Sequence, residues 1–366
     1  MTEENQDENK LIALRREKLT AIRAQRVAFP NNFVREDTAI KLIEQFEGKS
    51  KDELEELAAT ATIAGRIIRM RGPFVVVQDG SGQMQIYMNN KSFSDEKAEE
   101  LKAFDLGDII GVQGEMFKTG KGELTLRAAE FDLLTKSLRP LPDKHKGLTD
   151  TEMRYRQRYV DLIVNEQSRK IFQTRSRILR FIRQYFESLD FMEVETPMMQ
   201  VIPGGATARP FITHHNALDQ DMYLRVAPEL FLKRLVVGGF ERVFELNRNF
   251  RNEGLSTRHN PEFTMLEFYQ AYARYEDLMD LTEDLFRKIA TEVGGSSKLS
   301  YQGSEYDFSQ PFARLSVTES IKKHCLVTDD AAFATAESVA ALASSLDVHF
   351  DESWPKGKIL MEIFDQ

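Results

Sequence analysis

Residues 244–253 alternate between hydrophobic and polar side chains with the period of a β-strand, yet the alternation contains charges. Phe244, Leu246 and Phe250 fall on one face, interrupted by Arg248. The other face carries polar positions alone: Asn247, Asn249, Arg251 and Glu253. Charge on a strand costs free energy when it is buried without a partner. The pattern therefore predicts a strand with a binding face.

A second strand pattern follows after a stretch rich in turn residues. The turn contains Gly254, Ser256, Asn260 and Pro261. Beyond it, a common face carries Phe263, Met265, Glu267 and Tyr269. The two patterns predict a long antiparallel hairpin, with a wide basic loop that includes Arg258 and His259.

If the two polar faces coincide, the hairpin displays a surface that could bind an anion, a cation and a planar ring together. The alternative is an exposed hairpin with solvated charges, since half-solvated antiparallel sheets are common. Phe263, Met265 and Tyr269 argue against that alternative, because they are poor choices for open solvent. The basic loop beside them suggests phosphate contacts.

Residues 62–134 carry shorter alternating patterns separated by the glycine-rich turns DGSG and KTGKG. The strand-like stretches are 61–71, 73–89 (two strands), 108–119 and 122–134, and a helical pattern lies near 97–104. Five strands with a helix between the third and fourth are typical of an OB-fold barrel. Such barrels bind single-stranded nucleic acid by stacking bases on aromatic side chains.

Helical patterns flank these strands, and the fold class is α+β. We expect a helix over 9–25, helices over 275–291 and 316–346, and a connector over 138–150 where Pro, Gly and charge concentrate. The predicted organisation has an N-terminal helical extension at 1–60, a barrel at 61–137, the linker at 138–150 and a second domain at 151–366. Its last part, from about 293 to 366, is a helical insertion.

Composition favours a cytoplasmic protein with no membrane segment. The 366 residues include a single cysteine, Cys325, which excludes an intramolecular disulfide framework and fits a reducing compartment. No apolar run approaches the roughly 20 residues of a membrane span, and the start is acidic where a secretion signal would be basic.

The net charge of −9 argues mildly against a nucleic-acid partner, but the charge is unevenly distributed. Residues 154–183 are rich in arginine, whereas the stretch from Asp329 is rich in acids. The basic run could contact RNA or form a solvated helix face with intersubunit ion pairs, and the sequence leaves both open. The signatures of P-loops, dinucleotide folds, HExxH zinc enzymes and CxxC sites are absent, and the adjacent His214 and His215 are interpreted as structural.

The hairpin motif also resembles a known family. FRNEG (250–254) with RHNPEFTMLE (258–267) closely resembles the second signature motif of class II aminoacyl-tRNA synthetases, in the form found in lysyl-tRNA synthetases. The helical 167–187 followed by FMEVETP resembles the first class II motif, which implies a homodimer. IPGGATARPF (202–211) and YLRVAPELFLKRL (223–235) are similar to the lysine enzymes as well, so the resemblance covers essentially the whole chain.

This resemblance implies ATP-dependent activation of L-lysine to lysyl-adenylate, followed by transfer to the 3′ end of tRNA(Lys). Both attacking groups, the lysine carboxylate and the ribose hydroxyl of the tRNA, belong to substrates. The enzyme would therefore accelerate the reaction by positioning the substrates and by stabilising the phosphate charge with cations. The catalytic residues implied are Arg251, Glu253 and His259. The ATP-binding residues implied are Arg251, Glu253, His259, Asn260, Phe263 and Met265, with Phe263 stacking on adenine.

Lysine recognition requires carboxylates and an aromatic hydroxyl for the side-chain ammonium. The resemblance assigns this role to Glu229, Glu267 and Tyr269, and adds Gly205 and Arg251 as further lysine-binding residues. On the barrel it implies anticodon contacts by Arg69, Phe74, Gln85 and Glu123. Phe74 is the expected stacking residue.

The family continues beyond the position that corresponds to Gln366, with a third motif that supplies an adenine-binding arginine and the acidic ligands of Mg²⁺. We therefore expect an incomplete catalytic domain, no metal ligand within this chain, a metal site beyond Gln366, and no activity from these residues alone. Two interpretations follow, a fragment of an active lysyl-tRNA synthetase or an inactive tRNA-binding and dimerising module. Aspartyl and asparaginyl enzymes are disfavoured, because VAPELFLKRL lacks their serine-proline-glutamine signature.

Overall fold

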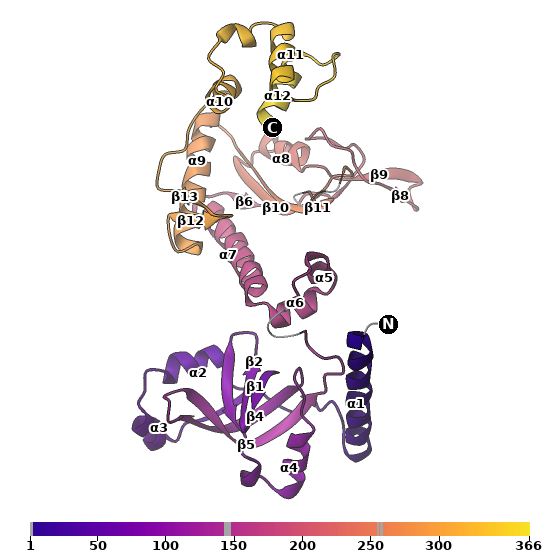
Figure 1. Ribbon diagram of the computed structural model, residues 1–366. Helices are drawn as coiled ribbons and strands as arrows, with labels where there is room; N and C mark the ends of the chain where they lie inside the picture. The colour runs from indigo at the N-terminus through magenta and orange to yellow at the C-terminus, as the bar shows by residue number, and fades with distance from the viewer. Residues whose placement is uncertain (1–2, 143–147, 255, 257–258) are drawn as a thin grey trace. The chain divides into compact units, whose positions relative to one another are not determined.

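A computed structural model describes residues 3–142, 148–254, 256 and 259–366, which form two compact units. The first unit is Met1–Arg169 and the second is Lys170–Gln366 (Figure 1). No helix in the described ranges is both long and apolar enough to cross a membrane.

The first unit contains a closed five-stranded barrel in the order β1-β2-β3-β5-β4. The strands are β1 (Thr60–Arg71), β2 (Phe74–Gln78), β3 (Gln83–Tyr87), β4 (Ile109–Lys118) and β5 (Leu124–Thr135). Neighbours are antiparallel except β3 and β5, which are parallel. The short helices η1 (Asn90–Ser92) and α4 (Asp95–Lys102) lie between β3 and β4. The predicted OB-fold barrel is confirmed, including the helix between the third and fourth strands.

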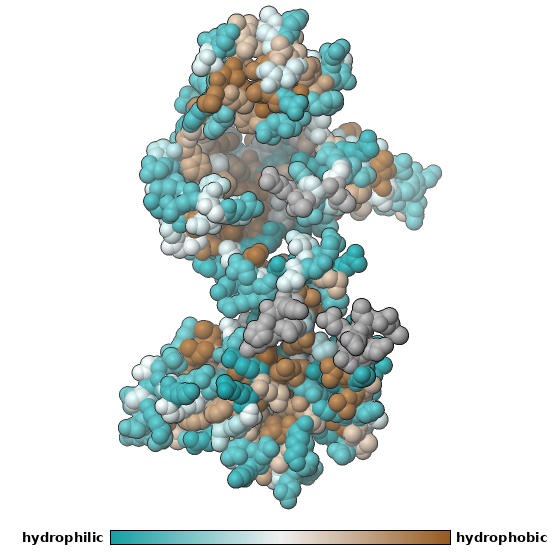
Figure 2. Space-filling model, in the orientation of Figure 1, coloured by the Kyte–Doolittle hydropathy of each residue, from teal (hydrophilic) through white to brown (hydrophobic). Residues whose placement is uncertain are grey.

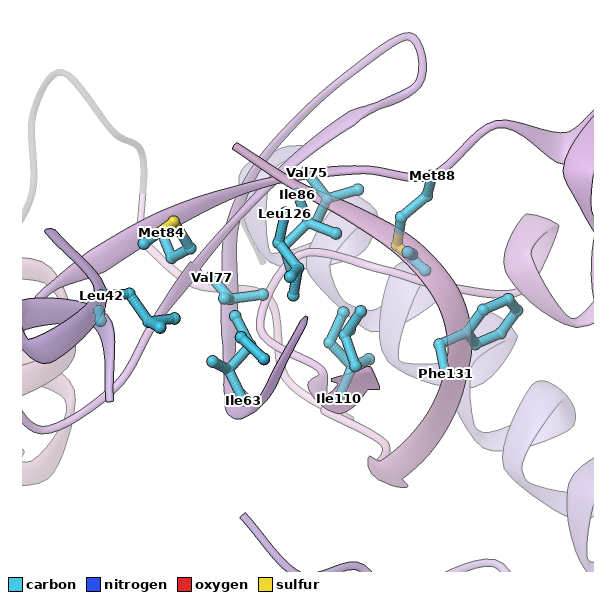
Figure 3. Packing of buried hydrophobic residues seen from close by; sticks show 14 of the residues in the cluster. Leu42, Ile63, Val75, Val77, Met84, Ile86, Met88, Ile110, Leu126 and Phe131 are labelled. Atoms are coloured by element: carbon cyan, nitrogen blue, oxygen red, sulfur yellow. The ribbon is translucent and has the colours of Figure 1, made fainter. Parts of the chain in front are cut away.

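The barrel core is built from alternate residues of its strands. Figure 3 shows Ile63, Val75, Val77, Met84, Ile86, Ile110 and Leu126 packed together, and each is at most 2% exposed. Full burial of one such side chain stabilises the fold by roughly 1.5–3 kcal/mol. Gly114 lies at a register shift between β4 and β5, where a Cβ atom would stand 2.0 Å from the Arg127 carbonyl oxygen. Only glycine permits the strands to approach this closely.

Helices α1 (Glu3–Gln25), α2 (Ala39–Phe46) and α3 (Lys51–Leu57) precede the barrel. The predicted N-terminal helix is confirmed and begins earlier than expected. Buried Arg15 on α1 donates to the carbonyl oxygens of Ser137 and Arg139 at 3.2 and 3.1 Å. This contact fixes α1 against the chain that leaves the barrel. Residues 143–147 of the predicted linker lie outside the described residues.

The division between the units falls after Arg169, later than the predicted domain boundary at 150. Helices α5 (Thr151–Arg156) and α6 (Arg158–Val164) belong to the first unit. Residues of α6 and of the first turn of the next helix form hydrogen bonds with the barrel. Gln78 Nε2 donates to the Ile163 carbonyl at 3.1 Å, and Arg169 Nη2 donates to the Asp79 carbonyl at 2.7 Å.

The second unit is centred on a sheet in the order β11-β10-β6. Its strands are β6 (Met192–Glu193), β10 (Arg242–Phe250) and β11 (Glu262–Gln270), and the predicted antiparallel hairpin of β10 and β11 is confirmed. Helices α7 (Glu166–Ser188) and α9 (Tyr275–Lys288) supply aromatic and aliphatic side chains to the core on one face. Within it, Phe186 stacks on Phe244 with ring centroids 4.9 Å apart.

A second three-stranded sheet has the order β7-β9-β8, from β7 (Met199–Gln200), β8 (Ile212–His215) and β9 (Gln220–Leu224). Helix α8 (Glu229–Val237) follows it. Next to α9 comes a π-helical turn, η2 (Ile289–Val293), and a hairpin of β12 (Lys298–Tyr301) and β13 (Ser304–Asp307). The helical insertion predicted from about 293 thus contains a short hairpin before its helices.

The helical pattern expected over 316–346 forms several short helices. It is divided into α10 (Val317–His324), η3 (Asp330–Phe333) and α11 (Ala336–Ser345), followed by α12 (Lys356–Asp365). Leu326 has φ of +56° directly after α10, which ends the helix. These helices enclose their own core around Val339, Ala343 and Ile359. In Figure 2 hydrophobic side chains also show at their surface, where Met361 and Phe364 are 44% and 47% exposed.

Candidate active site

The two polar faces of the β10–β11 hairpin coincide, as predicted. Cross-strand neighbours on this face are Val243 with Tyr269, Glu245 with Glu267, Asn247 with Met265, and Asn249 with Phe263. The opposite face carries Phe244 and Leu246, which are buried in the core with α7 and α9. The hairpin is therefore not an exposed pair of strands with solvated charges, since one face is packed and the other carries a set of specific polar contacts.

Arg251 and Phe263 lie together at the open end of this face. The guanidinium carbon of Arg251 is 5.2 Å from the centre of the Phe263 ring, a cation–π distance. The Arg251 amide donates to the Pro261 carbonyl at 2.9 Å, which fixes the backbone there. Arg251 Nε is buried and has no hydrogen-bond partner among the described residues. A buried cationic donor without a partner suits an anionic ligand.

Glu253 is exposed and lies just beyond the end of β10. The described residues contain no ion pair between its side chain and that of Arg251. Instead the Arg209 amide donates to Glu253 Oε1 at 3.4 Å, and the Asn252 amide donates to the Arg209 carbonyl at 2.7 Å. The strand pattern ends at Phe250, so side-chain alternation no longer applies at Glu253.

His259 and Asn260 lie in the loop between the strands, and both are exposed. His259 Nδ1 is 2.8 Å from Ser256 Oγ, and the His259 amide donates to the same oxygen at 3.2 Å. These two contacts hold the imidazole beside Ser256. Arg258 lies outside the described residues.

Glu267, Tyr269 and Glu229 form an acidic pocket, a name used here for these three residues. Tyr269 Oη donates to Glu267 Oε1 at 2.8 Å. Burial raises the pKa of Glu267 above its ordinary value, the Tyr269 hydrogen bond lowers it, and the charges of Glu229 and Glu245 raise it again. Burial and the bond to Glu267 raise the pKa of the Tyr269 phenol, so Tyr269 acts as a neutral donor.

Gly205 presses against this pocket from the loop before β8. Its φ is +91°, and a Cβ atom there would stand 2.8 Å from Glu229 Cβ and 3.1 Å from Ala227 Cβ. The chain can approach Glu229 so closely only with glycine at this position. Lys233, one turn further along α8, pairs with Glu229 Oε1 at 2.5 Å and lies 5.8 Å from the Tyr269 ring centre. An ammonium group is thus already accommodated at the edge of the acidic pocket.

Met265 lies on the same face, where Asn249 Nδ2 is 3.1 Å from its sulfur. Asn249 is 1% exposed, and its side-chain oxygen has no partner among the described residues. The sequence reasoning placed Asn249 on the polar face but gave it no role. Glu245, Arg225 and Lys233 were also missed, although a glutamate inside a strand of buried residues is a signal that could have found Glu245.

No group of three or more His, Cys, Asp or Glu side chains in the described ranges is arranged to hold a metal ion. His214 Nδ1 instead lies 2.9 Å from Asp221 Oδ1 within the β8–β9 pair.

The barrel carries a second candidate site on the outer face of its strands. Phe74 on β2 packs against Tyr87 on β3 with ring centroids 5.2 Å apart, and Tyr87 lies 6.1 Å from Phe117 on β4. The guanidinium of Arg127 covers Phe117 at 4.5 Å. This row of three rings and one cation is longer than the single stacking residue that was predicted.

The other predicted anticodon residues lie around this row. Gln85 Nε2 donates to Thr125 Oγ1 at 3.0 Å, between β3 and β5. Arg69 and Glu123 are exposed, Arg69 beyond a bulge in β1 and Glu123 just before β5. Phe74, Gln85 and Arg69 thus lie on β2, β3 and β1, and Glu123 directly precedes β5.

Comparisons with known proteins identify relatives of both the barrel and the region that follows it. Residues 150–363 match the family model described as tRNA synthetases class II (D, K and N), and residues 61–134 match the OB-fold nucleic acid binding domain. The lysine–tRNA ligase of Chromohalobacter salexigens is 56% identical over 98% of this chain and 72% of its own length. That of Thioalkalivibrio sulfidiphilus is 54% identical over 100% of this chain and 74% of its own. The heat-inducible lysine–tRNA ligase of Escherichia coli K12 is 55% identical over 98% and 72%. The chain therefore belongs to the class II tRNA synthetases of the D, K and N group.

Proposed function

We propose that this chain acts in lysine–tRNA ligation, in which lysine is activated with ATP and transferred to the 3′ end of tRNA(Lys). The observation that carries the proposal is the acidic pocket of Glu229, Glu267 and Tyr269, because Glu267 and Tyr269 share one face of the hairpin with Phe263, against which Arg251 packs. The acidic pocket suits an ammonium group at the end of a long aliphatic side chain, and Arg251 with Phe263 suits a nucleotide. Relatives named lysine–tRNA ligase over nearly the whole chain support the same substrate.

The chemistry that fits these residues is in-line displacement at phosphorus. A lysine carboxylate oxygen bonds to the α-phosphorus of ATP while the bond from that phosphorus to the β-bridging oxygen breaks, and pyrophosphate leaves. Arg251, with its unpartnered Nε, would bind the α-phosphate and stabilise its growing negative charge. Phe263 would support the adenine ring, and Met265, His259 and Asn260 would line the rest of the nucleotide.

In the second step a ribose hydroxyl of the tRNA takes the lysyl group from the adenylate, and AMP leaves. No protein nucleophile is needed in either step, so the chain contributes orientation and charge. Glu253 holds the Arg209 segment in the structure, and we propose that it contacts the nucleotide from there. Magnesium, which the family uses to neutralise phosphates, finds no group of three or more His, Cys, Asp or Glu side chains in the described ranges that could hold it.

For the barrel we propose binding of the tRNA anticodon, with Phe74 stacking on a base and Gln85, Arg69 and Glu123 as polar contacts. The row of rings supports this proposal, because base stacking on an aromatic side chain contributes roughly 1–3 kcal/mol per base. A homodimer through α7 is the further proposal, supported by Ile171, which is 56% exposed on that helix. A cytoplasmic location completes it.

A finer proposal concerns the 366 residues on their own. The relatives are longer, since this chain spans 72–75% of the length of those compared at more than 95% coverage. We expect the isolated polypeptide to bind L-lysine and the anticodon arm without forming the adenylate. The alternative is a catalytically inactive tRNA-binding and dimerising fragment of the family, and it is supported by the compact unit that contains the barrel.

The deciding experiment is calorimetric titration of the protein with L-lysine, norleucine and ATP, together with lysine-dependent ATP–pyrophosphate exchange. Lysine binding with rejection of norleucine, which lacks the ammonium, supports the proposed function. Equal binding of both amino acids, or of neither, contradicts it. Pyrophosphate exchange by the 366 residues would support lysine activation and overturn the finer proposal.

A further inference from the structure

A buried ion pair lies directly behind the acidic pocket. Arg225 follows β9 and is 0% exposed, and its Nη1 donates to Glu245 Oε1 at 2.7 Å. The same nitrogen donates to Thr196 Oγ1 at 2.9 Å, and Arg225 Nε donates to the Arg248 carbonyl at 2.9 Å. Thr196 Oγ1 in turn donates to Glu245 Oε2 at 2.6 Å. One arginine thus joins three segments that are far apart in the sequence.

Glu245 stands opposite Glu267 in the register of β10 and β11. Side chains of opposed residues in an antiparallel pair share a face and have Cβ atoms about 4.5–5.5 Å apart. Glu245 is 1% exposed, so water does little to screen its charge from Glu267. Left without a counter-ion, Glu245 would repel the ionised form of its neighbour.

Charged and titratable groups face Glu267 from every element packed around it. Tyr269 comes from its own strand, Glu245 from β10, Glu229 from α8 and Arg225 from the segment after β9. Lys233 of α8 reaches Glu229 from the solvent side. Arg225 is the buried cation of this group, and it pairs directly with Glu245.

One nitrogen of the Arg225 guanidinium is left without a hydrogen bond in the part of the chain that the structure describes. This nitrogen is Nη2, which is buried. A buried carboxylate near like charges gains a proton, and a nearby cation opposes that gain. Glu267 can attract an ammonium group only while it is ionised.

We propose that Arg225 is a positioning residue for substrate recognition: by offsetting the charge of Glu245, it keeps Glu267 ionised and able to bind the ammonium of lysine. This inference rests on the proposed function for its ligand, but the electrostatic coupling of Arg225, Glu245 and Glu267 can be measured without any ligand. Arg225 does not touch the substrate in this role.

The test is a pH titration of glutamate side-chain carboxyls by ¹³C NMR on the 366-residue protein, with Glu267→Gln identifying the Glu267 signal. In Arg225→Met we expect the pKa of Glu267 to shift upward, because a cation is removed. In Glu245→Gln we expect it to shift downward, because an anion is removed. In the double variant Arg225→Met/Glu245→Gln we expect it to return close to the wild-type value, because the two charges cancel.

A purely structural role for Arg225 would not give shifts of opposite sign, so an unchanged midpoint, or one that moves in the same direction in both single variants, overturns the proposal. If Arg225→Met does not fold, Glu245→Gln and the double variant still decide it. L-lysine titrations at pH 7 test the role of Arg225 in lysine binding separately from its electrostatic coupling to Glu267. We expect Arg225→Met to weaken lysine binding about tenfold and the double variant to restore most of it. Failure of the wild-type protein to bind lysine would contradict the proposed function. The electrostatic coupling of Arg225, Glu245 and Glu267 would still be decided by the NMR titrations.

Discussion

Tyr269 and Glu267 lie on the same face of β11, and the Tyr269 hydroxyl donates a 2.8 Å hydrogen bond to Glu267 Oε1. The bond orients one carboxylate oxygen and leaves the other free for a ligand. It also lowers the pKa of Glu267, in opposition to burial and to the charges of Glu229 and Glu245. A tyrosine at this position therefore serves both geometry and charge.

Replacing Tyr269 by Phe should weaken L-lysine binding at pH 7. A hydrogen bond to a charged group contributes roughly 1.5–3 kcal/mol, which corresponds to a loss of about tenfold to a hundredfold. Calorimetric titration measures the effect directly. Tyr272→Phe is the matched control, because Tyr272 is 96% exposed. Unchanged lysine affinity in Tyr269→Phe would remove Tyr269 from the pocket.

Glu267 should make the stability of the protein depend on pH. Its pKa in the folded protein is raised above the ordinary 4.5, so the folded state binds the proton more tightly than the unfolded state. Stability from this group is therefore lost as pH rises from 4.5 through the raised value. We expect Glu267→Gln to raise the melting temperature at pH 7.5 and to lose this advantage towards pH 4.5.

Scanning calorimetry at the two pH values checks this prediction. Glu262→Gln, on the same strand with a side chain 54% exposed, is the control and should show little pH-dependent difference from wild type. An equal shift of melting temperature in Glu267→Gln at both pH values would argue against a perturbed carboxyl.

Removing the Arg251 side chain should reduce ATP affinity. Arg251→Ala loses a buried cationic donor beside Phe263, and we expect a loss of about tenfold to a hundredfold, the range for a charge-assisted hydrogen bond. Arg248→Ala is the matched control, because Arg248 lies three residues earlier, on β10, with a side chain 49% exposed. If both variants bind ATP like the wild type, the assignment of Arg251 to phosphate is wrong.

On the barrel, Phe74→Ala should weaken binding of an anticodon stem–loop by roughly 1–3 kcal/mol, the contribution of one stacked base. Fluorescence anisotropy with a labelled lysine stem–loop measures it. Phe29→Ala is the control, since Phe29 is 47% exposed and lies outside the barrel strands. Arg127→Ala tests whether the row extends beyond Phe74, and equal affinity there would limit the site to β2 and β3.

The barrel also depends on a buried lysine. Lys136 Nζ pairs with Asp108 at 2.7 Å and with Asp105 at 2.5 Å, and both Lys136 and Asp108 side chains are 0% exposed. Lys136→Met leaves a buried carboxylate without its cation, which costs about 3–5 kcal/mol of unfolding free energy. Urea denaturation checks this, with Lys102→Met, on an exposed pair with Glu99, as the control. A loss below 1 kcal/mol would show that water or another cation replaces Lys136.

The two strand-rich regions could be predicted because period-two alternation is a local signal that burial enforces. The faces of β10 and β11 and the positions of the barrel strands along the chain followed from it. The pair of Arg225 and Glu245 could not be predicted, because it forms only when segments near residues 196, 225 and 245 meet. The same holds for the contact of Phe117 with Tyr87, which joins different strands.

In the helical insertion, local sequence preference predicted the type of element but not where each helix ends. Alanine-rich sequence around 336–345 favours helix locally, but nothing in that preference marks where the chain must turn back to close a core around Val339 and Ile359. The β12–β13 hairpin was missed for a related reason. Its strands have four residues each, too few for alternation to be distinguished from chance.

The packed and polar faces of the hairpin have a consequence for how β11 tolerates change. Phe268 contacts the aromatic core through Phe186, whereas Phe263, Glu267 and Tyr269 face the site. A library of all single substitutions along this strand should therefore separate into two interleaved classes. Substitutions at the positions that face the site should keep the soluble yield of the protein and lose ligand binding. Substitutions at the positions between them, which face the core, should lower the soluble yield first. The tolerance to substitution would therefore repeat every two positions along the strand.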